Sequence, residues 1–201
     1  MNFEYERAAA AKGWRHICGV DEAGRGPLPG PVYAAAVILP DGLVIEGLND
    51  SKKLTEKKRE ALFDVICDQA VAYSIASASA KEIDEINILQ ATFLAMRRAV
   101  EGLPVKADYA IIDGNRMPPL DIEGETLIKA DALSPSVAAA SILAKVSRDR
   151  YMYELDRELP QYQFAKHKGY GTKLHYEMLT KFGASEHHRV TFLRSFYNGK
   201  K

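Results

Sequence analysis

The segment that most constrains this chain is residues 24–31, with the sequence Gly-Arg-Gly-Pro-Leu-Pro-Gly-Pro. Its prolines and glycines exclude both a regular helix and a central strand. Apolar runs stand on either side, at 17–20 and 32–39, and each predicts a buried strand. The chain must therefore pass from one strand to the next through a rigid loop.

Two adjacent carboxylates, Asp21 and Glu22, end the first of these strands, and Arg25 lies in the loop that follows. Glycine lets backbone N–H groups approach a ligand closely, and arginine supplies a planar set of donors. This combination indicates a phosphate-handling site. The alternative is that both acids are solvated residues at a strand end. A dinucleotide-binding loop is disfavoured, because the spacing is G-x-G-x-x-x-G and the prolines remove N–H donors that a pyrophosphate needs.

The length and composition predict a single domain of ordinary size over residues 1–201, because 47% of its residues are hydrophobic and can form a core. No run of eighteen apolar residues occurs and the N-terminus is polar, which argues against a membrane span or a signal peptide. Cys18 and Cys67 lack metal-type spacing and are expected to be free thiols. We therefore expect a cytoplasmic protein with no membrane association.

Charge is divided unevenly along the chain although the net charge is zero. Residues 1–140 hold 15 Lys and Arg against 21 Asp and Glu, and residues 141–201 hold 12 against 6. A basic C-terminal third combined with an acidic site elsewhere suits a polyanionic substrate. A solvated charged face is an equally good interpretation of this division taken alone.

Periodicity and turn residues predict the remaining elements. Ser134-Pro135 is a strong helix start, because a side-chain cap precedes a proline in the first turn. The loop at 164–171 is basic and aromatic, and the part from about 150 to 201 is expected to be mainly helical. The expected strands are 43–45, 70–80, 109–112 and 127–129, and the expected helices are 4–12, one after Thr55, 82–101, one from Ser134 through Arg150, and one from Thr172 to Gly183.

Three of the predicted strands end in carboxylates, namely Asp21 with Glu22, Asp113 and Asp131. Ligands of open α/β sheets bind outside the carboxyl ends of strands, so these acids converge if the strands are neighbours. Converging carboxylates repel one another and need cations, and hard oxygen ligands favour Mg²⁺ or Mn²⁺. Two such ions, roughly 3.5–4 Å apart, would clamp the attacking and leaving oxygens of a phosphodiester.

The sequence closely resembles ribonuclease HII, the bacterial type 2 ribonuclease H. The matching blocks follow the family's order and cover most of the chain: GVDEAGRGPLPGPVYAAAVIL (19–39), LNDSKKL (48–54), INILQATFLAMRRAV (86–100), IDGN (112–115), KADALSPSVAAASILAKVSRDR (129–150) and HKGYGT (167–172).

This resemblance implies an α/β ribonuclease H-like fold, a mixed central sheet with helices on both faces and a helical C-terminal region. It implies hydrolysis of the RNA strand of RNA/DNA hybrids and incision 5′ to ribonucleotides embedded in duplex DNA, leaving a 3′-hydroxyl and a 5′-phosphate. Asp21, Glu22, Asp113 and Asp131 match the catalytic acids, which hold two Mn²⁺ or Mg²⁺ ions.

The resemblance also implies how a ribonucleotide is recognised. Gly24, Arg25 and Gly26 match the loop that reads the ribose 2′-hydroxyl and its phosphate, largely through backbone groups. Tyr170 matches the tyrosine that packs on the following deoxyribose. Backbone reading of a 2′-hydroxyl distinguishes RNA from DNA whatever the base.

Further candidate nucleic-acid contacts come from the residues themselves: Ser51, Lys52, Lys53, Lys145, Arg148 and Lys168. The alternatives are that Lys52 and Lys53 are solvated and that Arg148 pairs with Asp149 or Glu154. His175, His187 and His188 lack metal-ligand spacing and are interpreted as structural or surface groups.

Two positions depart from the family pattern. Ala130 stands where glycine is more usual, and Val190-Thr191 replaces Arg-Ser, which removes one expected basic contact. Three rival functions remain: a type 3 ribonuclease H, disfavoured because only about sixteen residues precede the first strand, a non-catalytic hybrid-binding module, and a phosphodiesterase for small substrates. A monomer without an obligate protein partner is expected.

Overall fold

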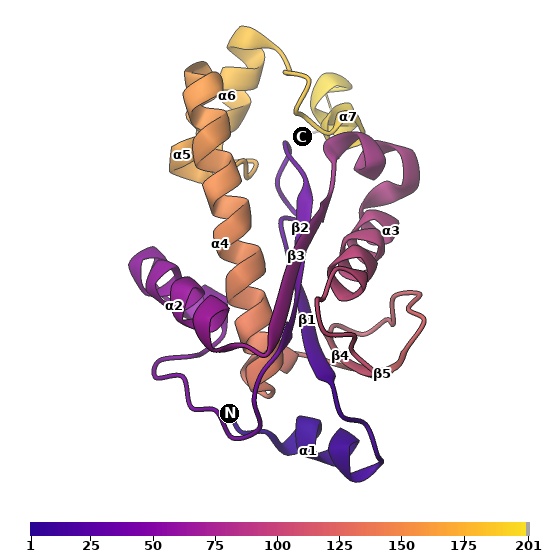
Figure 1. Ribbon diagram of the computed structural model, residues 1–201. Helices are drawn as coiled ribbons and strands as arrows, with labels where there is room; N and C mark the ends of the chain where they lie inside the picture. The colour runs from indigo at the N-terminus through magenta and orange to yellow at the C-terminus, as the bar shows by residue number, and fades with distance from the viewer. Residues whose placement is uncertain (200–201) are drawn as a thin grey trace.

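A computed structural model describes residues 1–199 and contains a five-stranded mixed sheet in the order β3-β2-β1-β4-β5 (Figure 1). The antiparallel neighbours are β1 with β2 and β2 with β3, and the parallel neighbours are β1 with β4 and β4 with β5. The predicted α/β fold with a mixed central sheet is thus confirmed. The strands are β1 (Ile17–Ala23), β2 (Val32–Ile38), β3 (Ala72–Ala78), β4 (Tyr109–Asp113) and β5 (Glu123–Leu127).

Helices cover both faces of the sheet, as predicted. On one face α3 (Ala80–Glu101) packs against the strands, and on the other α4 (Pro135–Glu158) does so with α2 (Glu56–Gln69) outside it (Figure 1). Val20 and Ile112 belong to the apolar cluster beneath α3, whereas Ala35 and Val37 belong to the cluster beneath α4. This alternation along neighbouring strands is what a sheet buried on both faces requires.

The start of α4 is held firmly against β1. Ser134 caps the helix by accepting from the Val137 N–H, as its position before Pro135 predicted. Glu6 of α1 (Glu4–Ala11) accepts from the Ser134 hydroxyl at 2.5 Å and from the Ser136 N–H at 3.2 Å. The helix approaches so closely that a Cβ on Gly19 would lie 2.2 Å from the Ser136 carbonyl carbon.

The C-terminal region is helical, as expected. Figure 1 shows these helices at the end of the sheet where the loop between β1 and β2 turns. Hydrogen bonds join the two, from the Leu28 N–H to the Gly169 carbonyl and from the Gly30 N–H to the His187 carbonyl. The remaining elements are η1 (Ser51–Lys53), η2 (Ala130–Ala132), η3 (Pro160–Tyr162), α5 (Phe164–His167), α6 (Lys173–Phe182) and α7 (Val190–Tyr197).

Two of the strand predictions were wrong. Residues 43–45 form no strand: Ile45 packs into the core and Val44 is exposed, but β3 already pairs with the free edge of β2. The strand predicted at 127–129 lies earlier, because β5 ends at Leu127. After it Lys129 adopts a left-handed conformation, and Asp131 stands in η2 and not at a strand end.

Three helical features also differ from the predictions. Helix α3 is interrupted at Asn87 (φ 66°), whose side chain caps the second half by accepting from the Leu89 and Gln90 N–H groups. The predicted loop at 164–171 contains the short helix α5. Helix α7 was not predicted individually, because its cap comes from α3: Asp84 accepts from the N–H groups of Val190 and Thr191.

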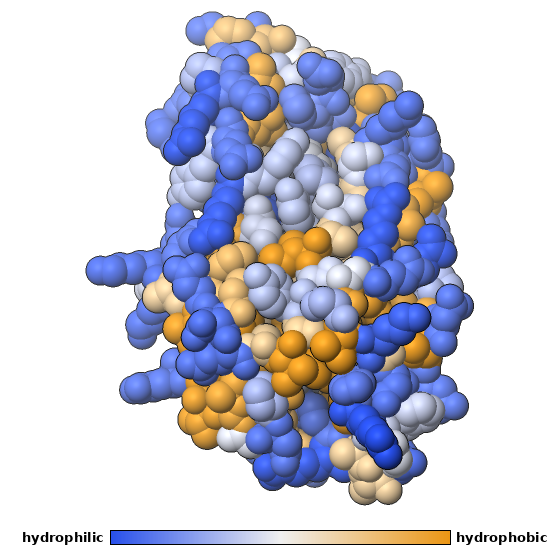
Figure 2. All heavy atoms as spheres, in the orientation of Figure 1, coloured by the Kyte–Doolittle hydropathy of each residue, from blue (hydrophilic) through white to orange (hydrophobic). Residues whose placement is uncertain are grey.

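Figure 2 shows hydrophobic residues gathered across the middle of one face, with hydrophilic residues along the sides. The side chains of Val71 and Tyr73, near the edge strand β3, are among the exposed apolar groups. Within residues 1–199, no helix combines the length and the apolar character needed to cross a bilayer.

Candidate active site

Three carboxylates meet beside the ends of β1 and β4. Asp21, Asp113 and Asp131 each offer an oxygen within 4.8 Å of the others. The register of the parallel pair, with Val20 opposite Ile112, places the first two side by side. The turn at Lys129 delivers the third, and it is fixed by a 2.7 Å hydrogen bond from the Ala130 N–H to the Asp113 carboxylate. Three of the four acids that were predicted to converge therefore lie together, and Glu22 is not among them.

The electrostatics of this cluster favour a bound cation. Asp21 is 4% exposed, and its burial, followed by the nearby Glu22 and Asp113, raises its pKa well above the usual range. Burial and Asp113 likewise raise the pKa of Asp131. Both shifts reflect negative charge without enough compensation, which a divalent cation would supply. Carboxylate oxygens with no sulfur or imidazole among them fit Mg²⁺ or Mn²⁺.

Glu22 stands apart from the cluster of three. Its carboxylate is 3.4 Å from the Arg25 guanidinium, and both residues line a cavity of about 330 Å³ with Asp113. Burial raises the pKa of Glu22, and Arg25 opposes that rise. Glu22 and Asp113 therefore face the same cavity.

Lys52 faces the acids from the other side. A cavity of about 520 Å³ is lined by Lys52 and Lys53 together with Asp113 and Asp131. Burial alone would lower the pKa of Lys52, but the carboxylates of Asp21 and Asp131 outweigh it and the pKa is raised. Three lysines, Lys52, Lys53 and Lys129, thus line the cavity beside the acids, where a phosphate would need positive groups.

Ser51 lies behind the acids and not on the surface. Its hydroxyl is 2.8 Å from that of Ser141 on α4, and both residues are buried. Ser141 in turn hydrogen-bonds to Asp21, which partly opposes the rise in that pKa. A direct contact of the Ser51 side chain with nucleic acid does not fit this burial, because its hydroxyl is bonded to Ser141 inside the protein. Ser141 was missed, since nothing in the sequence distinguishes one serine of an Ala-rich helix.

The glycine loop and Tyr170 lie together. Gly24 is buried with φ +99°, and a Cβ there would meet Arg148 at 2.8 Å, so only glycine fits. Gly26 lies under the Tyr170 ring, because a Cβ on it would be 3.4 Å from that ring. Tyr170 is 46% exposed, so part of its ring is open to a ligand. The two segments that were matched to ribonucleotide recognition are thus adjacent.

Three predicted nucleic-acid contacts point into the protein. Arg148 is buried under the Tyr170 ring, 5.7 Å from its centroid, and donates to the Lys168 carbonyl at 2.6 Å. It lies 3.6 Å from Asp149, the pairing considered as an alternative, while Lys145 reaches Asp149 at 2.7 Å. The Lys168 ammonium donates to the Tyr153 hydroxyl. Lys145 and Lys168 are thus held by neighbouring protein groups, whereas Nε and Nη1 of Arg148 are buried without a hydrogen-bond partner among the described residues.

Two buried histidines, His175 and His188, form a chain of hydrogen bonds that begins at the Tyr170 carbonyl. His175 Nδ1 is 3.0 Å from the Tyr170 carbonyl, and His175 Nε2 is 3.1 Å from His188 Nε2. His188 Nδ1 accepts from the Ser185 N–H at 3.0 Å. Burial lowers the pKa of both His175 and His188 to about 4. They are neutral structural groups, as interpreted, whereas His187 lies 3.3 Å from the Tyr151 hydroxyl.

Sequence reasoning gave Arg189 no role, but it reaches the glycine loop. Its guanidinium donates to the carbonyls of Gly24, Arg25 and Gly30 at 2.7, 2.9 and 2.9 Å. The side chain is fully buried. No local signal connects a residue after two histidines with a loop more than 150 positions earlier, so only the folded structure reveals this contact.

Comparisons with known proteins agree with this geometry. The family model of ribonuclease HII matches residues 18–198. The ribonuclease HII of Caldicellulosiruptor bescii is 54% identical over 96% of this chain and 94% of its own length. The crystal structure of ribonuclease H2 from Pyrococcus horikoshii superimposes with a TM-score of 0.76 at 28% identity, covering 92% of this chain and 97% of that one. The structure of Bst-RNase HIII in complex with Mn²⁺ has the same fold, with a TM-score of 0.74 at 19% identity over 96% of this chain and 73% of that one.

Proposed function

Because the chain belongs to the ribonuclease HII family, we propose that it nicks duplex DNA on the 5′ side of an embedded ribonucleotide, leaving a 3′-hydroxyl and a 5′-phosphate. Its coarser activity follows from membership: it is a metal-dependent endoribonuclease that acts on RNA/DNA hybrids. The observation that carries the finer proposal is the position of the Gly24–Gly26 loop and Tyr170. This adjacency supports recognition of the ribose by the Gly24–Gly26 loop and Tyr170.

In the proposed reaction the four acids would bind the metal ions. Asp21, Asp113 and Asp131 would hold two divalent cations, Mn²⁺ or Mg²⁺, with Glu22 completing the set on the Arg25 side. When bound, such cations supply an activated water nucleophile and stabilise the charge that develops on the phosphate. Lys52 and Lys53 would attract the phosphate toward the acids. No histidine base is required, because the water is activated by the cations.

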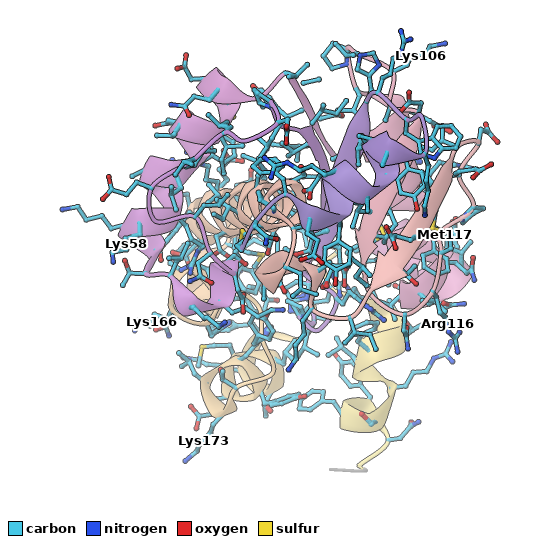
Figure 3. All side chains as sticks on the ribbon, turned by 90° about the horizontal axis from the view of Figure 1, so that it is seen from below. Lys58, Lys106, Arg116, Met117, Lys166 and Lys173 are labelled. Atoms are coloured by element: carbon cyan, nitrogen blue, oxygen red, sulfur yellow. The ribbon has the colours of Figure 1, made fainter. Side chains whose placement is uncertain are left out.

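The glycine loop and Tyr170 would select the substrate. A 2′-hydroxyl can both donate and accept a hydrogen bond, so exposed backbone groups of the loop can read it whatever the base is. The exposed part of the Tyr170 ring would pack on the sugar that follows. Basic side chains extend this surface: Figure 3 shows Lys166 and Lys173 projecting from one side of the molecule and Arg116 from the other. Such positive groups suit the phosphates of a long duplex.

The first experiment uses a labelled DNA duplex with one central ribonucleotide, incubated with the protein and Mn²⁺ or Mg²⁺. We expect a single nick on the 5′ side of the ribonucleotide, which a chelator abolishes. An all-DNA duplex of the same sequence serves as the control and stays intact. Cleavage confined to long RNA/DNA hybrids would refute the embedded-ribonucleotide proposal, and binding without cleavage in either metal would indicate a non-catalytic hybrid-binding protein.

Replacement of Tyr170 tests whether its ring recognises the junction between the ribonucleotide and the following deoxyribonucleotide. Tyr170→Ala should lose roughly tenfold or more of kcat/KM on the single-ribonucleotide duplex and less on a long hybrid, because a hybrid has no RNA-to-DNA junction at each cleavage site. Tyr170→Phe keeps the ring and should retain most activity. Equal losses on both substrates for Tyr170→Ala would remove the junction role from this residue.

A further inference from the structure

Arg189 is buried yet binds only backbone carbonyls of the glycine loop. The three acceptors belong to Gly24, Arg25 and Gly30. The Arg189 N–H adds a fourth bond to the loop, to the Leu28 carbonyl at 2.8 Å. One residue close to the start of α7 therefore fixes both the beginning and the end of the segment between β1 and β2.

The geometry of the peptide bond determines which backbone groups the loop presents on its outer face. Across a trans peptide bond, the carbonyl of one residue and the N–H of the next point in opposite directions. The structure contains no cis peptide among the described residues. Because Arg189 holds the Gly24 and Arg25 carbonyls inward, the N–H groups of Arg25 and Gly26 must point outward, away from the guanidinium.

Those two N–H groups are available to a ligand. Gly24 is buried, but Arg25 and Gly26 are exposed. Within residues 1–199 neither N–H donates a hydrogen bond to another protein group. Adjacent, parallel donors that point to solvent beside the Tyr170 ring form a receptor for a hydroxyl or phosphate oxygen.

We propose that Arg189 is the positioning residue for ribonucleotide selection, because it orients the Arg25 and Gly26 N–H groups that meet the substrate. This inference rests on the proposed function and adds to it a residue that touches no substrate. Arg189 acts through the loop: without it, three inward carbonyls lose their donor and the peptide planes of the loop are free to rotate.

Only arginine can make this set of contacts. Its planar fork presents several donors at fixed angles, whereas a lysine ammonium is a single point with three rotatable hydrogens. Burial and the neighbouring Arg148 lower the pKa of Arg189 to about 9, so it stays protonated at neutral pH. The side chain also packs on the Phe192 ring, 5.0 Å from its centroid, which helps to hold it in place.

The experiment compares binding to two duplexes that differ by one hydroxyl. Affinities are measured with Ca²⁺ in place of the catalytic cation, for a DNA duplex with one ribonucleotide and for the same duplex in all-DNA form. The variants are Arg189→Met, which keeps the length without a donor, and Arg189→Lys, which keeps the charge. Arg194→Met is the matched control, since Arg194 is an exposed arginine on helix α7, which begins directly after Arg189.

We expect the ratio of the two affinities to fall about tenfold in Arg189→Met, to fall less in Arg189→Lys, and to stay at the wild-type value in Arg194→Met. A loss of folded protein would lower both affinities equally and leave the ratio unchanged, so the ratio reports positioning and not stability. If Arg189→Met does not fold, Arg189→Lys carries the test alone. A wild-type ratio in folded Arg189 variants would overturn the inference, whereas a wild-type protein that does not distinguish the two duplexes would overturn the proposed function instead.

Discussion

At the scale of single residues, the site joins groups that repel one another. Asp21 and Asp113 lie side by side on adjacent parallel strands, and burial strengthens their repulsion because water no longer screens it. The rest of the fold offsets this cost, since β1 and β4 are buried in the centre of the sheet. Function and stability therefore make opposite demands on the same carboxylates.

This opposition gives the first prediction. Asp21→Asn and Asp113→Asn should each lower kcat at least a hundredfold while the metal-free protein keeps or gains thermal stability, because each change removes one of several like charges. The measurement is cleavage of a hybrid, paired with thermal unfolding in a chelator. Asp121→Asn, an exposed acid away from the cluster, is the control and should change neither. Cleavage at the wild-type rate by either site variant would contradict the assignment of the acids.

At the scale of elements, the C-terminal helix depends on a residue from another helix. Asp84 of α3 accepts from the N–H groups of Val190 and Thr191, the first two residues of α7, and from the Thr191 hydroxyl. A carboxylate at this position also interacts favourably with the helix dipole. Since Arg189 immediately precedes Val190, the cap that starts α7 also fixes the backbone from which Arg189 reaches the loop.

Removing this cap should weaken the C-terminal region. Asp84→Ala is expected to lower the free energy of unfolding by about 1–2 kcal/mol, the usual effect of losing a helix cap. Denaturant unfolding measures this change, and Glu85→Ala, an exposed neighbour on the same helix, should change stability by less than about 0.5 kcal/mol. Identical unfolding of the two variants would show that α7 does not need Asp84.

Elements with local signals were predicted correctly, and elements fixed by distant partners were not. Ser134 before Pro135 and Thr172 before α6 are caps that stand next to their own helices, so the sequence alone locates them. The cap of α7 comes from residue 84, and β5 is a half-exposed edge strand with two glutamates. The same distinction applies to the site. The acidic cluster was identified because its members follow apolar runs in the sequence. The inward direction of Arg148 depends on tertiary packing, which the spacing of residues in the sequence does not show.

At the scale of the whole molecule, a chain of neutral histidines joins α6 to the segment before α7. The contact of His175 with the Tyr170 carbonyl requires a proton on Nδ1, which leaves its Nε2 to accept from His188. His188 Nδ1 must then accept from Ser185. An added proton on either ring removes an acceptor that the chain of hydrogen bonds needs.

Stability should therefore depend on pH in a defined window. The folded pKa of His175 and of His188 is about 4, below the ordinary value of 6.5. The unfolded chain thus binds more protons between these values, so stability is full above about pH 6.5 and falls toward pH 4, by up to about 3 kcal/mol for each histidine. Denaturant unfolding at pH 7.5, 5.5 and 4.5 measures the slope. His175→Asn should flatten the slope and the exposed His16→Gln should not; a parallel slope in all three proteins would contradict this origin.

The hydrogen bonds from Arg189 to the loop join two segments that are synthesised at different times. Chains are synthesised from the N-terminus at about 5–20 residues per second. Asp131, the last acid of the cluster, is made before Arg189. All four candidate acids are thus synthesised before the residue that we propose to position the Gly24–Gly26 loop.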